Sequence, residues 1–368
     1  WDLHGVKPAF FEVPACVIRG RRTDERHAGS LPSTADVWTG NLTARDMSWN
    51  AACSRLTIRS GRVVAAKTST PASPYAASFV QGATLVPRMM CFVDKLPAGP
   101  LGRVTGEVLV RSRRTATEKQ PWKSLPALEA TVESRFVFPV HVGDTILPHR
   151  VQTPLGAVIP WAGEVLLHGG EDRLARYPGL SEWWKRAEAL WTEHRSSERL
   201  TLIERWDYQR GLSKQFGANG KCPNIRVVYS ASGMYLAAAV ITDPTAIIEH
   251  KLYWTNCTSK KEAHYLTVIL NSTTVTLAVR KYQARGQHNP RDFDKYVWQL
   301  PIPRYEAALP LHERLAALGS RAAVLVAKLE LPKTRFEKQR RFVREQLAAS
   351  DIGKDIERAV RELLDTDE

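Results

Sequence analysis

The sequence predicts an α+β fold in which a strand-rich body is followed by a helical tail. Short apolar and β-branched runs separated by proline and glycine fill much of residues 1–309, which is typical of strands with long connections. Residues 181–195 and 259–272 instead carry apolar side chains at helical spacing. Beyond residue 309, leucine and alanine recur at heptad spacing, which predicts helices toward the C-terminus.

The strands of the first half are predicted from short apolar runs. Residues 7–19 form one such run, and Ser60-Gly61 would turn residues 55–66 into a hairpin. A glycine breaks residues 79–95, which we interpret as a strand pair. Further strands are expected at 104–111 and 132–142.

The helix predicted at residues 181–195 has Ser181 as a suitable N-cap. Its apolar face contains Trp183, Ala187, Leu190 and Trp191. Tryptophan at this spacing favours a core face over a surface for stacking on bases.

Residues 225–272 predict three strands and then a capped helix. The runs "IRVVYS", "MYLAAAVI" and "AIIEHKLYW" are separated by turn signals, so we expect a meander. Ser259 followed by Glu262 forms a capping box. Ala263, Leu266, Ile269 and Leu270 should be buried, and Asn271 could end the helix in the left-handed conformation.

Residues 310–368 predict a helical tail that packs on itself or on another part of the protein. Pro332 should end its first helix, and further helices are expected at 334–348 and 351–364. The heptad seam comprises Leu311, Leu315, Leu318, Ala322, Leu325 and Leu329.

Composition favours a polyanionic partner. The net charge is +14 and the pI about 9.7, which fits nucleic acid before an anionic membrane surface. No apolar run approaches the roughly 20 residues of a membrane span. The five cysteines lack a C-x-x-C pair, so we expect buried cytoplasmic thiols rather than disulfides or zinc ligands. Trp1 at the start leads us to expect a piece of a longer chain.

Motifs for common enzyme chemistries are missing from the sequence. Neither glycine-rich phosphate-loop pattern occurs, and there is no H-E-x-x-H or G-x-S-x-G. Asp243, Glu249 and Lys251 loosely match the spacing of a metal-dependent nuclease. Such triplets arise often by chance, so this hypothesis is kept only as an alternative, and we predict no metal site.

Two segments without acidic residues, 208–226 and 271–291, are the predicted DNA contacts. Arginine and lysine can neutralise phosphates, and glutamine, asparagine and arginine can recognise base edges. The predicted contact residues are Arg210, Lys214, Gln215, Lys221, Arg226, Arg280, Lys281, Arg285, Gln287 and His288.

An ordered set of motifs resembles the target recognition domain of adenine-specific DNA methyltransferases. The combined restriction–modification enzymes of the Eco57I type carry this domain, and type I specificity subunits are similar. The central match comprises Glu262-Ala263, Tyr265-Leu266, Ile269-Leu270-Asn271-Ser272, Gly286, Phe293, Lys295, Val297 and Leu300-Pro301-Ile302-Pro303. Upstream, "GATLVPR" (82–88), residues 121–140 and "LSKQF" (212–216) also resemble that family.

The resemblance implies a division of the chain and a role for it. Residues 1–30 would be the last strands of a truncated methyltransferase domain, 31–309 the DNA target recognition domain, and 310–368 the tail. The family's F-x-G-x-G methyl-donor loop and Asn-Pro-Pro-Tyr motif are absent. The parent enzyme would use S-adenosylmethionine and flip an adenine. This chain would bind double-stranded DNA beside a catalytic domain, with no catalytic residue or cofactor of its own.

Two further functions stay open. The chain could be a metal-dependent nuclease, or a protein-interaction scaffold that binds other subunits of a phage-defence complex through the heptad seam.

Overall fold

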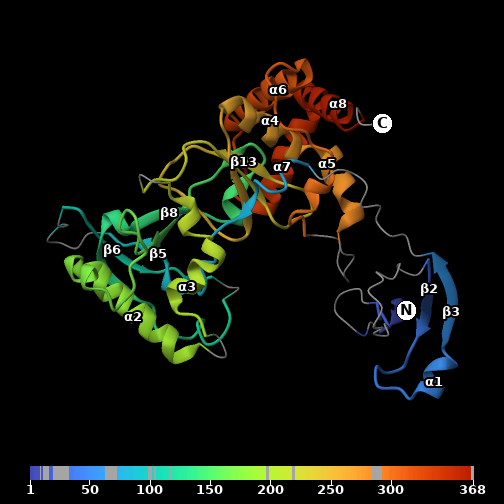
Figure 1. The fold of residues 1–368 in the computed structure, drawn as a ribbon, viewed down its shortest axis with the longest axis horizontal. Coiled ribbons are helices and arrows are strands. Elements are labelled where there is room, and N and C mark those ends of the chain that lie inside the picture. The colour runs from blue at the N-terminus through green and yellow to red at the C-terminus, as the bar shows by residue number, and fades with distance from the viewer. Residues whose placement is uncertain are drawn as a thin grey trace, which may run out of the picture.

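The computed structural model describes residues 1–8, 10, 16–19, 33–62, 73–97, 102, 105–115, 118–195, 199–217, 220–283 and 292–365. Within these residues the strands form a three-stranded, a two-stranded, a six-stranded and a four-stranded sheet. Figure 1 shows the helices from residue 260 onward (α4 to α8) at one end of the body and those within residues 178–206 (α2 and α3) at the other, and strand pairing is mostly antiparallel. The fold is therefore α+β, as predicted.

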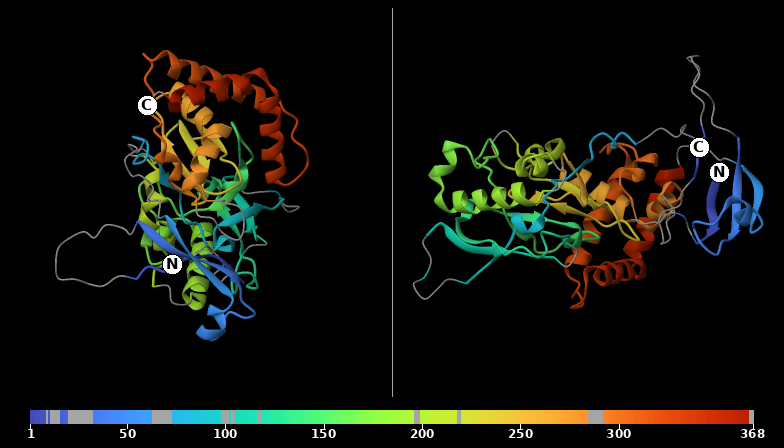
Figure 2. Two further views of the ribbon diagram at one scale, coloured as in Figure 1. Left: turned by 90° about the vertical axis from the view of Figure 1, so that its right-hand side faces the viewer. Right: turned by 90° about the horizontal axis from the view of Figure 1, so that it is seen from below.

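The N-terminal strands form a small sheet with its own core. Val6, Trp38, Leu42 and Ala52 are buried together there. The sheet lies apart from the rest of the body in Figure 1 and in the right-hand view of Figure 2. Its elements are β1 (Asp2–Lys7), β2 (Thr34–Asn41), α1 (Trp49–Cys53) and β3 (Leu56–Arg62), in the strand order β1-β2-β3.

The sheet lobe consists of the six-stranded sheet with helices α2 (Pro178–His194) and α3 (Leu202–Trp206). Helix α2 buries Trp183, Trp184 and Ala187 against this sheet. The strands, in sheet order, are β14 (Ile247–Ile248), β8 (Val137–His141), β11 (Leu155–Val158), β5 (Phe92–Lys95), β6 (Glu107–Ser112) and β7 (Glu129–Glu133).

The start of α2 is capped from the sheet rather than by Ser181. The Glu133 carboxylate accepts hydrogen bonds from the Gly179 and Leu180 amides at 3.1 and 2.8 Å. A carboxylate at a helix N-terminus satisfies unpaired amides and complements the helix dipole. Glu133 thus fixes α2 on β7, and the helix begins three residues before the predicted cap.

The helical lobe consists of the four-stranded sheet and the five helices from α4 onward. The strands, in sheet order, are β13 (Ala238–Ile241), β12 (Arg226–Ser230), β15 (Leu252–Asn256) and β4 (Val80–Gln81). The helices are α4 (Lys260–Asn271), α5 (Thr273–Val279), α6 (Pro310–Ala327), α7 (Phe336–Ala349) and α8 (Asp351–Asp365). The small sheet of β9 (Ile146–Leu147) and β10 (Arg150–Val151) lies beside α7 and β13.

Alternate residues of the four-stranded sheet belong to two different apolar clusters. Val227 and Tyr229 pack with α4, whereas Val228 and Trp254 pack with Ile146 on the other face. Strands buried on both faces have nearly continuous apolar sequence, which explains the run "IRVVYS".

Short 3-10 helices link these elements: η1 (Arg88–Met90), η2 (Ser134–Phe136), η3 (Gly143–Thr145), η4 (Asp172–Arg176), η5 (Tyr208–Arg210), η6 (Ser213–Gln215), η7 (Arg280–Tyr282) and η8 (Tyr296–Gln299).

Helix α4 begins where the capping signal predicts. The Ser259 hydroxyl accepts a hydrogen bond from the Glu262 amide at 3.1 Å. The Glu262 carboxylate turns back to accept the Thr258 amide at 2.8 Å. Asn271 does not adopt the left-handed conformation; its amide group pairs with the N–H and the C=O of Ala238 on the edge strand β13. The Asn271-Ser272 pair therefore joins α4 to the sheet and leads directly into α5.

The predicted helical tail is confirmed, and it packs on the body of this same chain. Leu315, Leu318 and Ala322 of the heptad seam lie in one core with α4 and α8. The Glu357 carboxylate of α8 accepts hydrogen bonds from the Thr273 and Thr274 amides at 2.8 and 3.0 Å. This carboxylate caps α5 and fixes the tail to the helix before it.

Three strand predictions are wrong because pairing partners distant in sequence decide them. Residues 56–62 are one strand, and Ser60-Gly61 pair in register with Asp36 and Ala35 instead of turning. The segment 79–95 contains β4 and β5, which belong to different sheets. Residues 225–256 are not a meander, because β15 pairs with β12 on the side opposite β13. The predicted strand at 7–19 lies partly outside the described residues, because 9 and 11–15 are not among them.

The predicted domain boundaries at residues 30 and 309 each separate residues that belong to one structural unit. Strand β1 pairs in parallel with β2, so residues on both sides of position 30 belong to one sheet. Residues on both sides of position 309 belong to one apolar cluster. In the described part of the chain, none of the helices has the length and apolar character needed to cross a bilayer.

We predict that Gly319→Ala destabilises the protein although alanine favours helices. A Cβ atom at residue 319 would lie 2.3 Å from the His264 carbonyl oxygen, which is backbone and cannot move aside freely. The propensity gain of about 1 kcal/mol is outweighed by overpacking, so unfolding in urea should show a net loss of roughly 1–2 kcal/mol. Arg321→Ala, on the exposed face of the same helix, is the control and should change stability by less than about 0.5 kcal/mol.

Candidate nucleic-acid interface

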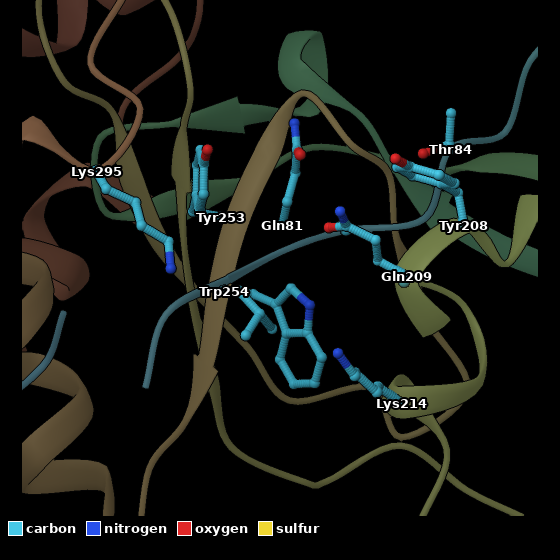
Figure 3. Close-up of a pocket in the computed structure, with 11 residues that line it drawn as sticks. Gln81, Thr84, Tyr208, Gln209, Lys214, Tyr253, Trp254 and Lys295 are labelled. Atoms are coloured by element: carbon cyan, nitrogen blue, oxygen red, sulfur yellow. The ribbon is translucent and has the colours of Figure 1, made fainter. Parts of the chain in front are cut away.

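A pocket of about 270 Å³ lies where the sheet lobe and the helical lobe meet. Among the described residues that line it, none is acidic. Figure 3 shows Lys295 on one side, Tyr208, Gln209 and Lys214 on the other, and Gln81 and Trp254 between them. The lining residues are Val80, Gln81, Gly82, Thr84, Tyr208, Gln209, Gly211, Lys214, Tyr253, Trp254 and Lys295. We call this site the interlobe pocket.

A sharp turn supplies one wall of the interlobe pocket. The Asp207 carboxylate accepts hydrogen bonds from the Leu212 and Ser213 amides at 3.0 and 2.7 Å. Between these anchors, Gln209 and Arg210 both have positive φ, at 52° and 60°. Each left-handed non-glycine residue costs about 1–2 kcal/mol. Such strain persists only where surrounding bonds impose it, and it concentrates at functional sites.

The opposite wall comes from the edge of the four-stranded sheet. The Gln81 side-chain amide donates to the His250 carbonyl at 2.8 Å, which holds it in place. The Trp254 indole N–H has no hydrogen-bond partner in the described structure, although the residue is only 4% exposed. Tyr253 stacks on Tyr229 with ring centroids 5.4 Å apart. The Gln81 amide and the two rings are thus held on rigid strands.

Of the five predicted contact residues in segment 208–226, three are exposed. Arg210 lies in the strained turn and Lys214 lines the interlobe pocket. Lys221 lies on the surface after the turn residue Gly220.

Gln215 and Arg226 are buried, and the structure gives them other tasks. The Gln215 side chain bonds both the N–H and the C=O of Ile248, at 2.7 and 2.8 Å. The Arg226 guanidinium donates to the Asp243 carbonyl at 2.8 Å, and burial lowers its pKa. Because both side chains are enclosed, the prediction that they contact DNA is corrected, and we leave them out of the interface.

In segment 271–291, Arg280 lies over the Tyr235 ring, 5.5 Å from its centroid. Lys281 belongs to the short helix η7, but its side chain is outside the described structure. Arg285, Gln287 and His288 lie outside the described residues. At the base of this segment, the Gln283 side chain donates to the Asp292 carbonyl at 2.9 Å.

The nuclease alternative finds no support in the placement of its residues. Glu249 is fully buried, with Arg88 at 3.1 Å and His250 at 2.9 Å from its carboxylate. The Asp243 carboxylate instead accepts the Thr245 amide and hydroxyl. Among the described residues, no cluster of three or more potential metal-ligating side chains occurs.

Several pocket residues were not singled out from the sequence. Tyr208 and Gln209 fall in the acid-free segment, but nothing local marks the strained turn that presents them. Gln81 and Trp254 are strand residues whose position depends on pairing between β4 and β15. Lys295 does belong to the family resemblance, which was the one available signal.

Comparisons with known proteins give partial structural likenesses, among them two restriction enzymes. No family model matches the sequence, and no curated protein matches it. The Type IIL restriction-modification enzyme MmeI, solved in complex with DNA, aligns with a TM-score of 0.49 and 10% identity, over 90% of this chain. The type IIG restriction endonuclease BpuSI aligns with a TM-score of 0.34 and 12% identity, over 92% of this chain.

This chain spans 38% of the length of the first enzyme and 40% of the second. At these scores and identities the two likenesses support no conclusion about function. Any function must follow from the chemistry of the residues themselves.

We predict that Glu249→Gln lowers the free energy of unfolding at pH 7 by roughly 3 kcal/mol, because Arg88 then faces a neutral partner. Burial acts to raise the pKa of Glu249, but His250 and Arg88 outweigh it and hold the pKa below its ordinary value of 4.5. The ion pair therefore contributes fully above about pH 4.5 and loses its contribution as pH falls through the folded-state pKa. Urea unfolding from pH 7 to about pH 3 should show the gap between wild type and variant closing only below about pH 4.5. A gap of equal size at every pH would contradict this account. The control is Glu182→Gln, which removes an exposed carboxylate on the α2 surface.

We predict that Gln209→Gly leaves the free energy of unfolding unchanged or raises it by up to about 1 kcal/mol, since glycine adopts positive φ without strain. The measurement is the urea midpoint. A loss above about 1 kcal/mol would mean that the Gln209 side chain supports the fold, and it would remove the residue from the candidate interface.

Proposed function

We propose that this chain is the DNA target recognition portion of an S-adenosylmethionine-dependent, adenine-specific DNA methyltransferase. The parent enzyme would belong to a restriction–modification or phage-defence system. This portion binds double-stranded DNA and positions it for methylation by a catalytic domain that is not part of this chain.

The interlobe pocket is the observation that carries the proposal. Lys214 and Lys295 enter from opposite lobes and supply point charges for phosphates. Gln81 and Gln209 carry amides, the side-chain group that pairs with the edge of adenine. Tyr208 is 50% exposed and offers a ring on which a base can stack. Because the described lining has no carboxylate, nothing in it opposes a polyanion.

The charge of the chain and its sequence motifs support the same proposal. The net charge of +14 favours attraction to nucleic acid. The ordered motifs from Glu262 to Pro303 resemble the recognition domain of adenine-specific methyltransferases. The sequence lacks both the F-x-G-x-G and the Asn-Pro-Pro-Tyr motifs, so its residues do not fit a methyl-donor site and we derive no transfer step for them.

The scaffold alternative loses its main contact surface. Leu315, Leu318 and Ala322 of the heptad seam are buried within this chain. A partner could reach them only by displacing α4 or α8.

The test is a titration of the chain with mixed-sequence duplex DNA at about 50 and about 200 mM salt, with and without S-adenosylmethionine. We expect binding that weakens steeply with salt and ignores the methyl donor. A parallel selection from randomised duplexes should enrich one sequence with the wild type and a relaxed version of it with Gln209→Gly. No binding at low salt would overturn the proposal.

We predict that Lys214→Ala and Lys295→Ala each reduce the slope of log K against log salt by about 0.9, which corresponds to one phosphate contact. Lys185→Ala is the matched control, because Lys185 is exposed on α2 outside the interlobe pocket. Slopes equal to that of the control would show that these lysines are only solvated surface.

A further inference from the structure

A second surface, larger than the interlobe pocket, lies between α7 and the loop that connects β12 to β13. It encloses about 760 Å³ and is lined by Ser232, Gly233, Met234, Tyr235, Thr273, Phe336, Glu337, Arg340, Arg341, Arg344, Glu345 and Ala348. We call it the α7 groove. The α7 members recur three or four positions apart, so one face of the helix forms the wall.

Two arginines lie over the Tyr235 ring at this groove, and a third, Arg341, is exposed on α7 beside them. The guanidinium carbons of Arg280 and Arg344 lie over the Tyr235 ring, 5.5 and 4.6 Å from its centroid. Arg341 is exposed on α7 and also lines the groove. An aromatic face attracts a guanidinium while leaving its N–H groups available to acceptors. The ring therefore holds like charges close together at modest cost.

These arginines have no acidic partner at salt-bridge distance in the described part of the chain, and Arg344 Nη1 has no hydrogen-bond partner at all. Glu337 and Glu345 also line the groove, so its charge is mixed, but Arg340, Arg341 and Arg344 leave it net positive. Burial is the main cause that lowers the pKa of Arg344, and the nearby positive charge of Arg341 lowers this pKa further. An anion in the groove would relieve that repulsion.

The fourth arginine of the groove anchors the helix rather than facing a ligand. Arg340 donates to the Ile146 carbonyl at 2.8 Å and to the Gly143 carbonyl at 2.6 Å. Burial lowers its pKa to about 10, so it is still charged at neutral pH. It fixes α7 on β9 and η3, so the exposed Arg341 and the partly buried Arg344 beside it are held on a rigid element.

The α7 groove and the interlobe pocket are joined through a short, well-bonded segment. Ser232 at the groove forms a bridge with Asp292, and the Phe293 amide donates to the Ala231 carbonyl at 2.7 Å. Lys295, two residues beyond Phe293, lines the interlobe pocket. A ligand that is long and uniformly charged can therefore meet both surfaces, whereas a single small anion meets only one.

We propose that the α7 groove binds the phosphate backbone of double-stranded DNA through Arg341 and Arg344, with Tyr235 as the platform that holds Arg344 and Arg280. This inference rests on the proposed function and extends the DNA surface onto the helical tail. The contacts are with phosphates, so they strengthen and orient binding without selecting a sequence.

The test is the salt dependence of duplex binding by fluorescence anisotropy for Arg341→Ala, Arg344→Gln, Tyr235→Ala and Tyr235→Phe. Arg341→Ala and Arg344→Gln should each lower the slope of log K against log salt by about 0.9. Tyr235→Ala should weaken binding, and Tyr235→Phe should restore it because the ring is kept. The sequence enriched from randomised duplexes should be the same for all variants.

Arg321→Ala is the matched control, since it removes an exposed arginine from α6, which is also in the tail. Arg341 is exposed, so its replacement tests the inference even if Arg344→Gln impairs folding, which the urea midpoint reveals. The inference about the α7 groove would be overturned if Arg341→Ala and Arg344→Gln gave the same slope as Arg321→Ala while Lys214→Ala still lowered it. The proposed function would then still stand. Failure of the wild type to bind duplex DNA would overturn both.

Discussion

The backbone crossing of residues 82–83 with residues 248–252 holds the two lobes together. The Gly82 amide donates to the Leu252 carbonyl at 3.0 Å, and the Ala83 amide donates to the Ile248 carbonyl at 2.8 Å. A Cβ atom at residue 82 would lie 2.3 Å from the Ile248 carbonyl oxygen, so only glycine permits this approach. The Gln215 side chain completes the crossing by bonding both backbone groups of Ile248. Since β4 and the turn at 208–211 both adjoin this point, the shape of the interlobe pocket depends on it.

Rigid support explains how a strained turn can exist on the surface. Gln209 and Arg210 occupy the left-handed region, which is unfavourable for both side chains. Asp207 holds the turn from one end, and the Gly211 carbonyl receives the Gln215 side chain at the other. A recognition residue gains from such support, because the entropy of ordering its backbone is lost during folding rather than during binding. The chain therefore has a physical reason to retain glutamine where glycine would be less strained.

Local signals predicted the helices, whereas long-range pairing decided the strands and the site. The start of α4 follows from Ser259 and Glu262, which lie three residues apart and need no other part of the chain. Ser60-Gly61 has the composition of a turn, but pairing in register with β2 outweighs that preference. In the same way, Lys214 and Gln215 are neighbours in an acid-free segment, and charge patterning could not separate them. One points into the interlobe pocket and the other bonds Ile248, a distinction that exists only once the two lobes meet.

The net charge of the chain overstates the charge available to a ligand. Arg226 and Arg340 are buried and bonded to backbone carbonyls, and Arg88 neutralises Glu249. Arginine suits these positions because its planar group satisfies several carbonyls at once and stays charged when buried. Lys214 and Lys295 remain at the interlobe pocket, and Arg341 and Arg344 remain at the α7 groove. Because a salt slope counts only the phosphates that are neutralised, it measures this smaller set and not the total of +14. The cations available at the two surfaces are different residues from those that hold the fold together. Each surface can therefore be tested separately by mutating its own cations.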